Sequence, residues 1–381
     1  MVNNEQIVLK SNTTNIITKL LALADVKING KRPWDIKVNN PNFYSKVLSG
    51  GSLAFGESYM DGWWDCKALD QLFYKIISAK LDKKIKKDIW LTLQAVRAKI
   101  FNLQSKKRAF QIGERHYDMG NDLYKIMLDK RMTYTGGYWK NAKTLDRAQE
   151  AKLDLVCKKL NLKPGQKILD IGCGWGSFMK FAAQKYKVKC VGLTVSKEQA
   201  KLGEELCKGL TIEFRLQDYR EVNEKFDHII SLGMFEHVGP KNHRKYMEVA
   251  NRCLKDKGLF LLQTIGILNL NNGPSDPWLE KYIFPNGIIP NMKNIINAID
   301  GLFIVEDWHN FSRDYDKTLI AWFHNFDSNW GKIKDNYDSR FYRMWKYYLL
   351  CCAGAFRARH NQLWQIVLSK KGVPEGYNSI R

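Results

Sequence analysis

Two patterns of apolar residues divide the chain. From about residue 12 to residue 104, apolar positions recur every three to four residues, as in amphipathic helices. The stretches "TTNIITKLLALADV" and "LDQLFYKIISAKL" show this spacing, and the first opens on threonines suited to a helix N-cap. Between them, "GSLAFGESYMDGWWDC" (residues 51–66) contains three glycines and an Asp-Gly pair. We predict that this stretch is a turn-rich insert rather than a helix.

From residue 105 onward, short β-branched runs alternate with helical patterns. This alternation predicts right-handed βαβ units and a doubly wound, mostly parallel seven-stranded sheet, which binds ligands at the carboxyl ends of its strands. We therefore expect an α/β fold, with a smaller, mainly helical domain over residues 1–104 and a catalytic domain over residues 105–381. The expected strands are 167–171, 188–194, 211–216, 226–232, 258–264, 317–323 and 362–369.

Charge adds a first functional indication. The chain has 61 Lys and Arg against 39 Asp and Glu, a formal net charge of +22. A phosphate-bearing partner, either nucleic acid or an anionic membrane surface, explains this balance, and so does solubility alone. Residues 80–108 hold ten Lys or Arg and two Asp with apolar residues between them. They predict a basic amphipathic helix, which either docks on a membrane or packs with a solvated lysine face.

Cysteine spacing and the N-terminus narrow the class further. Eight cysteines occur without a Cys-x-x-Cys pair, so neither a zinc site nor a disulfide framework is indicated, and we expect no metal. The first residues lack the basic-then-apolar order of a signal peptide, and no apolar stretch approaches the roughly 18 residues that span a bilayer. We expect a reducing, cytoplasmic compartment.

The stretch "KILDIGCGWGSF" (residues 167–178) is the main candidate for cofactor binding. It places Asp170 at a strand end and then Gly172, Gly174 and Gly176 at Gly-x-Gly-x-Gly spacing. A dinucleotide loop would read Gly-x-Gly-x-x-Gly and lead a helix onto a pyrophosphate. The tighter spacing after an acid suits a ligand that brings an ammonium and a sulfonium. We therefore predict a Rossmann-like methyltransferase domain that uses S-adenosylmethionine.

The ends of the next two strands support this prediction. Enzymes of this type commonly close the second strand with an acid that holds the ribose, whereas this strand ends in Thr194, so Gln199 or Glu198 must help. The third strand ends in "LQDY", which places Asp218 in position to reach the adenine.

The methyl acceptor is less clear from local motifs. Enzymes that methylate pyrimidine carbon need a cysteine, often after proline, and the chain has no Pro-Cys pair. Enzymes that methylate amino groups commonly carry Asn/Asp-Pro-Pro-aromatic after the fourth strand, where this chain reads "GMFEHVGP". Nucleic-acid methylation is therefore disfavoured, and only the basic charge keeps it as the runner-up.

Several longer motifs carry a resemblance to a known family. They are "GESYMDGWWDC", "HYDMGNDLYKIMLDKRMTYTGGYW", "LDIGCGWGS", "GMFEHVGPKNH", "KYIFPNG", "WHNFSRDYDKTLIAW" and "CCAGAFRAR". Together they resemble the bacterial cyclopropane-fatty-acyl-phospholipid synthases over nearly the whole chain. The resemblance implies transfer of a methyl group from S-adenosylmethionine to the cis double bond of a phospholipid acyl chain, followed by ring closure. Aromatic faces such as Tyr315 and Phe235 are candidates to stabilise the carbocation that forms.

The resemblance also implies that a bound bicarbonate ion removes the final proton. Its cage would comprise Glu236, Gln263, Ile265, Tyr315 and Gly136. Two positions depart from the family pattern, because Gly136 stands where cysteine is usual and Gln263 where histidine is usual. Glutamine keeps a neutral N–H donor but cannot titrate near pH 7, so we expect a flatter pH response.

For the cofactor, the resemblance places Tyr134 and Thr135 at the methionine carboxylate and Gly172 and Gly174 along the loop. It places Thr194 and Gln199 at the ribose, and Gln217 and Asp218 at the adenine. It further implies a homodimer at the inner face of the cell membrane, whose partner is a bilayer with unsaturated acyl chains, and no nucleic-acid partner.

Several of these residues also have a purely structural interpretation. Tyr315 could pack within a strand, and Tyr59, Trp63 and Trp64 could lie in a hydrophobic core instead of contacting lipid. Histidines 116, 237 and 309 are expected to be structural. Two other functions stay open: a methyltransferase that stops at a methyl branch or acts on a small molecule, and a non-enzymatic membrane or RNA-binding protein.

Overall fold

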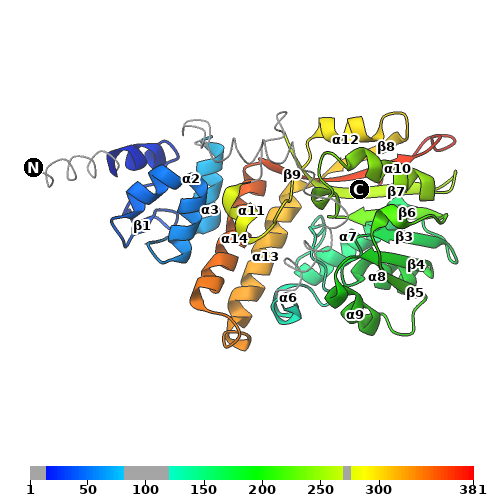
Figure 1. Cartoon of the computed structure of the whole chain (residues 1–381), viewed down its shortest axis with the longest axis horizontal. Helices are drawn as coiled ribbons and strands as arrows, with labels where there is room; N and C mark the ends of the chain where they lie inside the picture. The colour runs from blue at the N-terminus through cyan, green and yellow to red at the C-terminus, as the bar shows by residue number, and fades with distance from the viewer. Residues whose placement is uncertain (1–13, 81–119, 269–275) are drawn as a thin grey trace, which may run out of the picture. The chain divides into compact units, whose positions relative to one another are not determined.

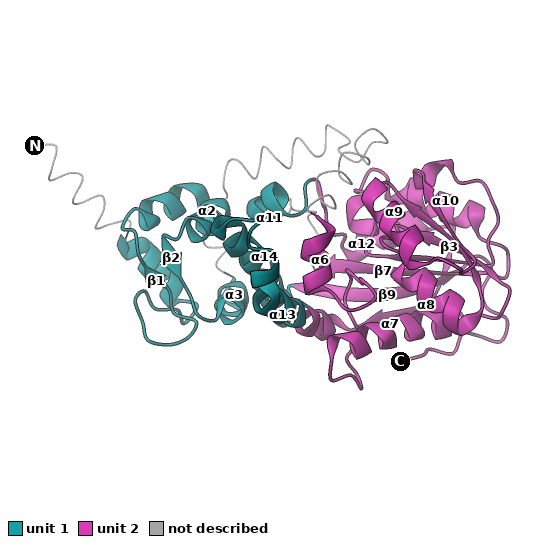
Figure 2. Cartoon of the chain, turned by 90° about the horizontal axis from the view of Figure 1, so that it is seen from below, with its two compact units in different colours: residues 1–101, 273–285, 319–360 teal, residues 102–272, 286–318, 361–381 magenta. Residues whose placement is uncertain are grey.

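The computed structural model describes residues 14–80, 120–268 and 276–381, which form two compact units. The first unit comprises Met1–Phe101, Gly273–Pro285 and Leu319–His360, and the second comprises Asn102–Asn272, Asn286–Thr318 and Asn361–Arg381 (Figure 2). The boundary expected at residue 104 and the basic segment from residue 81 to 108 lie outside the described residues. A single cut at residue 104 does not reproduce this division, because two later segments of the chain pack into the first unit.

The first unit is mainly helical. Helix α14 (Ser339–Arg357) packs against α2 (Phe43–Met60) and α3 (Leu69–Ser78), and α11 (Pro277–Tyr282) packs against α2. A short antiparallel pair joins β1 (Lys37–Val38) to β2 (Trp64–Asp65). Tyr59 and Trp64 are buried in this core, whereas Trp63 is half-buried with the Lys46 ammonium over its ring. For Tyr59 and Trp64, packing therefore replaces the suggested lipid contact.

The turn-rich insert predicted at residues 51–66 is largely wrong. Residues 51–60 belong to α2, which is interrupted only at Gly51, where φ is 55°. Gly56 serves close packing rather than a turn, because a Cβ atom on it would lie 2.3 Å from Cδ1 of Trp278. The Asp61-Gly62 pair does end the helix in a turn, with Gly62 at φ 74°.

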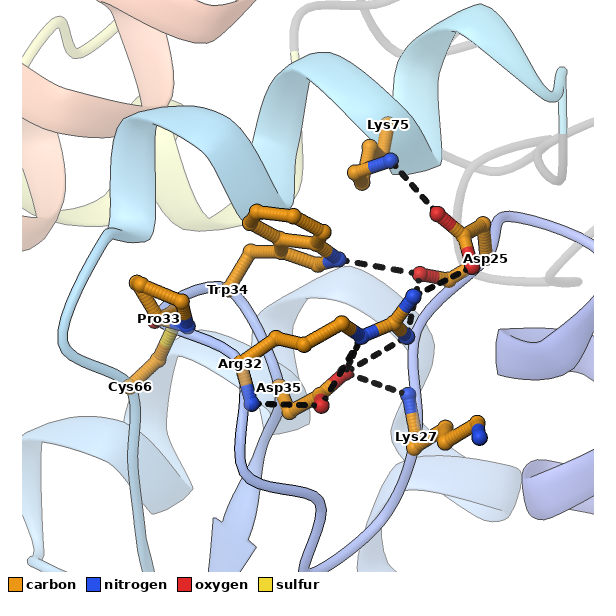
Figure 3. Close-up of polar contacts among 8 residues, drawn as sticks. All are labelled: Asp25, Lys27, Arg32, Pro33, Trp34, Asp35, Cys66 and Lys75. Carbon is orange, nitrogen blue, oxygen red and sulfur yellow. Dashed lines mark hydrogen bonds and ion pairs between the residues drawn. The ribbon is translucent and has the colours of Figure 1, made fainter.

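An ionic cluster ties the first segment of this unit to α3 (Figure 3). The Arg32 guanidinium donates to Asp25 at 2.6 Å and to Asp35 at 2.8 Å, and the Lys75 ammonium donates to Asp25 at 2.8 Å. Both cations also lie over the ring of Trp34. The hydrogen bonds from Arg32 lower the pKa of Asp35 to about 2.

The second unit is built on a seven-stranded sheet in the order β5-β4-β3-β6-β7-β9-β8 (Figure 1). All strands are parallel except β9, which is antiparallel to both of its neighbours. This confirms the predicted doubly wound α/β fold. The strands are β3 (Lys167–Ile171), β4 (Lys189–Thr194), β5 (Ile212–Leu216), β6 (His228–Leu232), β7 (Leu259–Ile267), β8 (Ile304–Asn310) and β9 (Asn361–Ser369).

Helices cover both faces of this sheet. One face buries side chains of α10 (His243–Cys253) and α12 (Met292–Ile299), and the other buries side chains of α7 (Leu145–Lys159) and α8 (Ser177–Tyr186). Neighbouring residues of β3 face opposite cores, as the two-residue period of a strand requires. The remaining elements are α6 (Asn121–Met127), α9 (Lys197–Leu206), α13 (Ser312–Asn329) and the 3-10 turns η2 (Tyr219–Glu221), η3 (Phe235–His237) and η4 (Trp330–Lys332).

The strand expected at residues 317–323 is wrong, because these residues lie in α13. Leu319, Trp322 and Phe326 are buried at spacings of three and four residues, which is a helical period. In chain order, the sixth strand of the seven-stranded sheet is instead β8, an edge strand. Its polar residues interrupt the apolar pattern that would have predicted a strand. A short apolar run cannot be assigned to helix or strand by hydrophobicity alone.

Within the described ranges, none of the helices combines the length and the apolar character needed to cross a bilayer.

Candidate active site

A cavity lies at the carboxyl ends of β3, β4, β5 and β6, where a doubly wound sheet binds its ligands. The segment Met132–Thr135 adds a further wall. Of the predicted cofactor residues, Gly176 does not line the cavity: it precedes α8, and a Cβ atom there would meet the ring of Phe214 at 2.5 Å. The predicted residues that do line it are Tyr134, Thr135, Asp170, Gly172, Gly174, Thr194, Gln199, Gln217 and Asp218.

The glycine loop lets the backbone form one wall of this cavity. Gly172 has φ 87°, and a Cβ atom on it would lie 2.8 Å from Cβ of Met234. Its N–H and that of Cys173 both donate to the carbonyl of Leu193, which fixes the loop to the end of β4. A side chain at position 172 would therefore strain the backbone and displace Met234.

The residues expected at the ribose form a small hydrogen-bonded group. The Thr194 hydroxyl donates to Oε1 of Gln199 at 2.9 Å and accepts the N–H of Ser196 at 3.1 Å. Gln199 is buried and lines the cavity, whereas Glu198 is exposed and does not. Gln199, rather than Glu198, is therefore placed to replace the missing acid.

The acid at the end of β5 is held in place by its neighbour. Arg220 donates to the carboxylate of Asp218 from Nε at 2.8 Å and from Nη2 at 2.5 Å, and its backbone N–H also donates there. Both side chains line the cavity. Asp218 thus presents a fixed carboxylate at the place where the adenine was expected.

Helix α7 supports the wall that carries Tyr134 and Thr135. Gln149 donates from Nε2 to the carbonyl of Thr135 at 2.7 Å, and Lys152, one turn further on, donates from Nζ to the hydroxyl of the same residue at 2.9 Å. Asp129 accepts the N–H of Thr133 at 2.8 Å. Our sequence reasoning missed Gln149 and Lys152, because polar residues on a helix carry no local sign of facing inward.

Glu236 follows β6 and occupies an unusual environment. Strand β7 continues beyond its last pair with β6, which is Leu232 with Gln263. Two residues further along β7, the N–H of Ile265 donates to Oε1 of Glu236 at 2.6 Å. Oε2 of Glu236 is buried and, among the described residues, has no hydrogen-bond partner. Burial raises the pKa of Glu236 to about 7, although the Ile265 hydrogen bond opposes this shift. Ile265 therefore orients Glu236 through its backbone N–H.

Gln263 lies two residues before Ile265 and hence on the same side of β7. Its Oε1 accepts a hydrogen bond from Nε2 of Gln365, its register partner on β9, at 3.0 Å. Both glutamines are buried. Because Oε1 is committed to Gln365, the Nε2 of Gln263 is the atom available as a donor.

Gly136 and Tyr315 are also neighbours. A Cβ atom on Gly136 would lie 2.7 Å from Cδ2 of Leu363 and 3.1 Å from Cγ of Tyr315. Leu363 pairs with Ile265 across the sheet, which brings Gly136, Tyr315 and Ile265 into one neighbourhood. Tyr315 lies in the first turn of α13, not in the strand that the sequence suggested.

Phe235 and His237 are close in sequence but have different surroundings. Phe235 is fully buried and stacks on His243 at 4.1 Å in the core below the sheet end, so it is not placed to stabilise a cation in the site. His237, which was expected to be structural, lines the cavity. Burial lowers the pKa of His237 to about 4, so its imidazole is neutral near pH 7.

Known proteins share this combination of fold and motifs. Residues 104–366 match the family described as mycolic acid cyclopropane synthetase. The chain is also 51% identical over 370 residues to the cyclopropane-fatty-acyl-phospholipid synthase of Escherichia coli, covering 97% of this chain and 96% of the relative.

The chain belongs to the mycolic acid cyclopropane synthetase family.

Two further proteins are similar to this chain. The crystal structure of the mycolic acid cyclopropane synthase CmaA1 complexed with SAH and CTAB superposes with a TM-score of 0.65 at 31% identity, covering 68% of this chain and 98% of that one. A probable fatty acid methyltransferase of Pseudomonas putida is 35% identical over 278 residues, which is 70% of each chain. The family thus includes proteins named for ring formation and for methylation.

Proposed function

We propose that this member of the family transfers a methylene group from S-adenosylmethionine to the cis double bond of acyl chains in membrane phospholipids. The observation that carries the proposal is the buried carboxylate of Glu236, which follows the strand end that borders the cofactor cavity. The near full-length identity to the Escherichia coli cyclopropane-fatty-acyl-phospholipid synthase supports the choice of substrate.

The cavity fits S-adenosylmethionine in shape and charge. Gly172 leaves room for a ligand against the loop backbone, Asp170 offers a buried acid, and Asp218 offers a second acid at the end of β5. When bound, the cofactor supplies an electrophilic methyl group on a sulfonium. Tyr134 and Thr135, which line the cavity, would hold its amino-acid end and so restrict the direction of the methyl group.

Alignment is the main requirement of the first step, since an alkene is a poor nucleophile. The π electrons of the double bond form the new bond to the methyl carbon, and the pair of the broken bond goes to sulfur. The acyl chain becomes a carbocation, and in this proposal the ring of Tyr315 would stabilise it by about 0.5 to 2 kcal/mol.

Ring closure then requires loss of a proton from the added methyl group. We propose that Glu236, Gln263 and Tyr315 hold a bicarbonate ion, which supplies the base. Oε2 of Glu236 is an acceptor for its hydroxyl, and Nε2 of Gln263 is a neutral donor for its negative oxygen. The electrons of the C–H bond close the ring as the proton leaves.

Gln263→His tests this proton-transfer site. Gln263 does not titrate near neutral pH, so wild-type activity should vary less between pH 6 and pH 9 than that of the histidine variant. The same pH profile for both proteins would contradict a role for Gln263 at the base.

We further propose that the protein acts as a homodimer at the inner face of the cell membrane. The net charge of +22 supports attraction to anionic lipid, and two basic faces in one assembly would raise its effective concentration there. Sedimentation at micromolar concentration tests the assembly, and a monomer would contradict it.

Product analysis tests the central proposal. The protein is incubated with S-adenosylmethionine labelled in its methyl group and with vesicles of unsaturated phosphatidylethanolamine or phosphatidylglycerol. After saponification, we expect labelled acyl chains whose proton spectrum shows cyclopropane rings and no vinylic signal for the modified carbons. Absence of label in the lipid would contradict the proposal.

A second candidate is methyl transfer without ring closure. The 35% identity to a probable fatty acid methyltransferase favours it as the alternative. Its product would keep a double bond and carry a methyl branch, so the same spectrum separates the two reactions.

A further inference from the structure

Lys152 is a fully buried lysine whose surroundings do not neutralise it by contact. It lies on α7, and its one hydrogen bond among the described residues goes to the hydroxyl of Thr135 at 2.9 Å. In the described part of the chain, no carboxylate forms an ion pair with it within 4.0 Å. Burying an ammonium without a carboxylate costs several kcal/mol, so this position calls for a physical explanation.

A second buried lysine on the same helix shows the usual solution. Lys159 is also fully buried, and its ammonium pairs with the carboxylate of Asp307 at 3.1 Å. Lys152 and Lys159 therefore differ in what compensates their charge, not in how deeply they lie.

The partner of Lys152 leads to the cofactor cavity. An ammonium only donates, so the oxygen of Thr135 accepts from Lys152 and its own hydrogen remains to donate to another group. Thr135 lines the cavity, and Gln149 fixes its backbone by binding its carbonyl. The hydroxyl of Thr135 is thus held as a donor at the cavity wall.

Asp170 provides the opposite charge on the same cavity. It is 3% exposed, lines the cavity, and lies near enough to Lys152 for each charge to stabilise the other. Burial raises the pKa of Asp170 to about 8 and lowers the pKa of Lys152 to about 8, although the carboxylates of Asp129 and Asp170 both oppose the shift of Lys152, Asp129 more strongly. Nearby groups of the protein therefore offset the burial of Lys152 and of Asp170 only in part.

We propose that Lys152 is a positioning residue for the amino-acid end of the cofactor, acting through Thr135. The Lys152 ammonium directs the Thr135 hydroxyl toward the cofactor carboxylate and supplies positive charge behind it. Asp170 supplies a carboxyl group that the cofactor ammonium would favour in its ionised form. This inference rests on the proposed use of S-adenosylmethionine. It assigns the zwitterionic end of the ligand to a buried pair of opposite charges.

Two ligands separate this role from a merely structural one. S-adenosylhomocysteine carries the amino-acid end, whereas methylthioadenosine keeps the adenosine and the sulfur but lacks the carboxylate and the ammonium. Titration calorimetry on Lys152→Met should show binding of S-adenosylhomocysteine weakened by about ten-fold or more. Binding of methylthioadenosine should change by less than about two-fold.

Lys159→Met is the matched control, since it removes a buried lysine from the same helix without touching Thr135. It should change the affinities for both ligands by the same factor. Thr135→Val is the second variant, because it removes the hydroxyl while Lys152 stays in place. It should reproduce the selective loss, and adding Lys152→Met to it should cause little further loss.

The possible results are distinct. Equal weakening of both ligands by Lys152→Met, or unchanged binding of S-adenosylhomocysteine, would overturn the inference. If Lys152→Met does not fold, Thr135→Val decides: loss confined to S-adenosylhomocysteine supports the inference, and equal loss overturns it. A wild-type protein that binds neither ligand would overturn the proposed function, and this inference with it.

Discussion

Glu236 has a different environment on each of its two oxygens. Oε1 accepts the N–H of Ile265, and Oε2 is buried with no partner among the described residues. Burial disfavours the charged carboxylate more than its hydrogen bonds favour it, so the pKa of Glu236 rises to about 7. Such a carboxyl group can hold a proton or an oxyanion near neutral pH, and it costs stability when it is ionised.

Glu236→Gln should separate the stability cost of ionising Glu236 from the role of this residue in ring formation. Folding raises the pKa from 4.5 to about 7, so the folded protein holds the proton more tightly than the unfolded chain. The wild type should then lose up to about 3 kcal/mol of stability as the pH rises from about 4.5 to about 7. Glutamine keeps an acceptor for the N–H of Ile265 but cannot ionise. The melting temperature of the variant, relative to that of the wild type, should therefore rise as the pH increases across this range.

Thermal unfolding at pH 5 and pH 8 measures this effect. A constant difference between the two melting temperatures would contradict it. In the same variant, ring formation should be lost while S-adenosylhomocysteine binds with unchanged affinity. Loss of that binding would mean that Glu236 serves the cofactor.

Gly136→Cys should test why glycine stands at this position. The added Cβ would lie 2.7 Å from Leu363 and 3.1 Å from Tyr315, so we expect a destabilisation of about 1 to 3 kcal/mol from overpacking. Denaturant unfolding measures this change. The control is Gly136→Cys combined with Leu363→Ala, in which the space is restored, so the added cysteine should cost less than in the wild-type background. An equal cost in both backgrounds would show that Leu363 is not the obstacle.

At the scale of elements, the first two turns of α13 are hydrogen-bonded to the segment that follows Tyr134 and Thr135. The Thr318 hydroxyl accepts the N–H of Gly137 at 3.0 Å and Nε1–H of Trp139 at 2.9 Å, and it donates to the carbonyl of Asp314. Asp314 in turn accepts the N–H of Trp139. These bonds place Tyr315 against Gly136, which no local pattern of either segment specifies.

Thr318→Val should therefore loosen the loop at residues 134–139. It leaves two donors without an acceptor, at a cost of about 1 to 3 kcal/mol for each buried one. We expect a lower melting temperature and a raised KM for S-adenosylmethionine, whereas Thr318→Ser, which keeps the hydroxyl, should stay close to the wild type. Equal effects of the two substitutions would contradict the role of the hydroxyl.

The elements also show what the sequence could and could not predict. The strand at 167–171 is bounded by a turn and a glycine loop, so both of its ends could be predicted from the sequence. Residues 317–323 form an apolar run that suits either structure, and only their packing makes them helical. The hydrogen bonds between Gln263 and Gln365 and between Lys152 and Thr135 join residues that are distant in sequence. The local spacing of residues in the sequence does not predict such contacts. The eight cofactor residues predicted from the motif resemblance all line the cavity, as does Asp170 from the glycine loop. Gly176 was predicted from the glycine spacing alone, and that spacing cannot distinguish a glycine needed for packing from one needed for a ligand.

At the scale of the whole molecule, charge and substrate class point in the same direction. A chain with a net charge of +22 is attracted to anionic phospholipid, which is the surface that presents its proposed substrate. Binding of the proposed cofactor would depend instead on buried groups such as Asp170 and Gln199, which salt screens much less.

Salt should therefore act on the lipid reaction and not on cofactor binding. On phosphatidylglycerol vesicles, raising the salt from about 0.05 M to about 0.5 M should lower the initial rate several-fold, because the screening length falls below about 10 Å. The affinity for S-adenosylhomocysteine, measured under both conditions, is the control and should stay constant. A rate that does not depend on salt would contradict electrostatic docking.

The most direct test of ring formation uses S-adenosylmethionine with three deuterium atoms in its methyl group. Mass spectrometry of the modified acyl chains then counts how many of the three deuterium atoms each chain retains. Methyl transfer followed by deprotonation of the added group predicts a product with two deuterium atoms in a cyclopropane ring. A product that retains all three would show a methyl branch and would contradict the account.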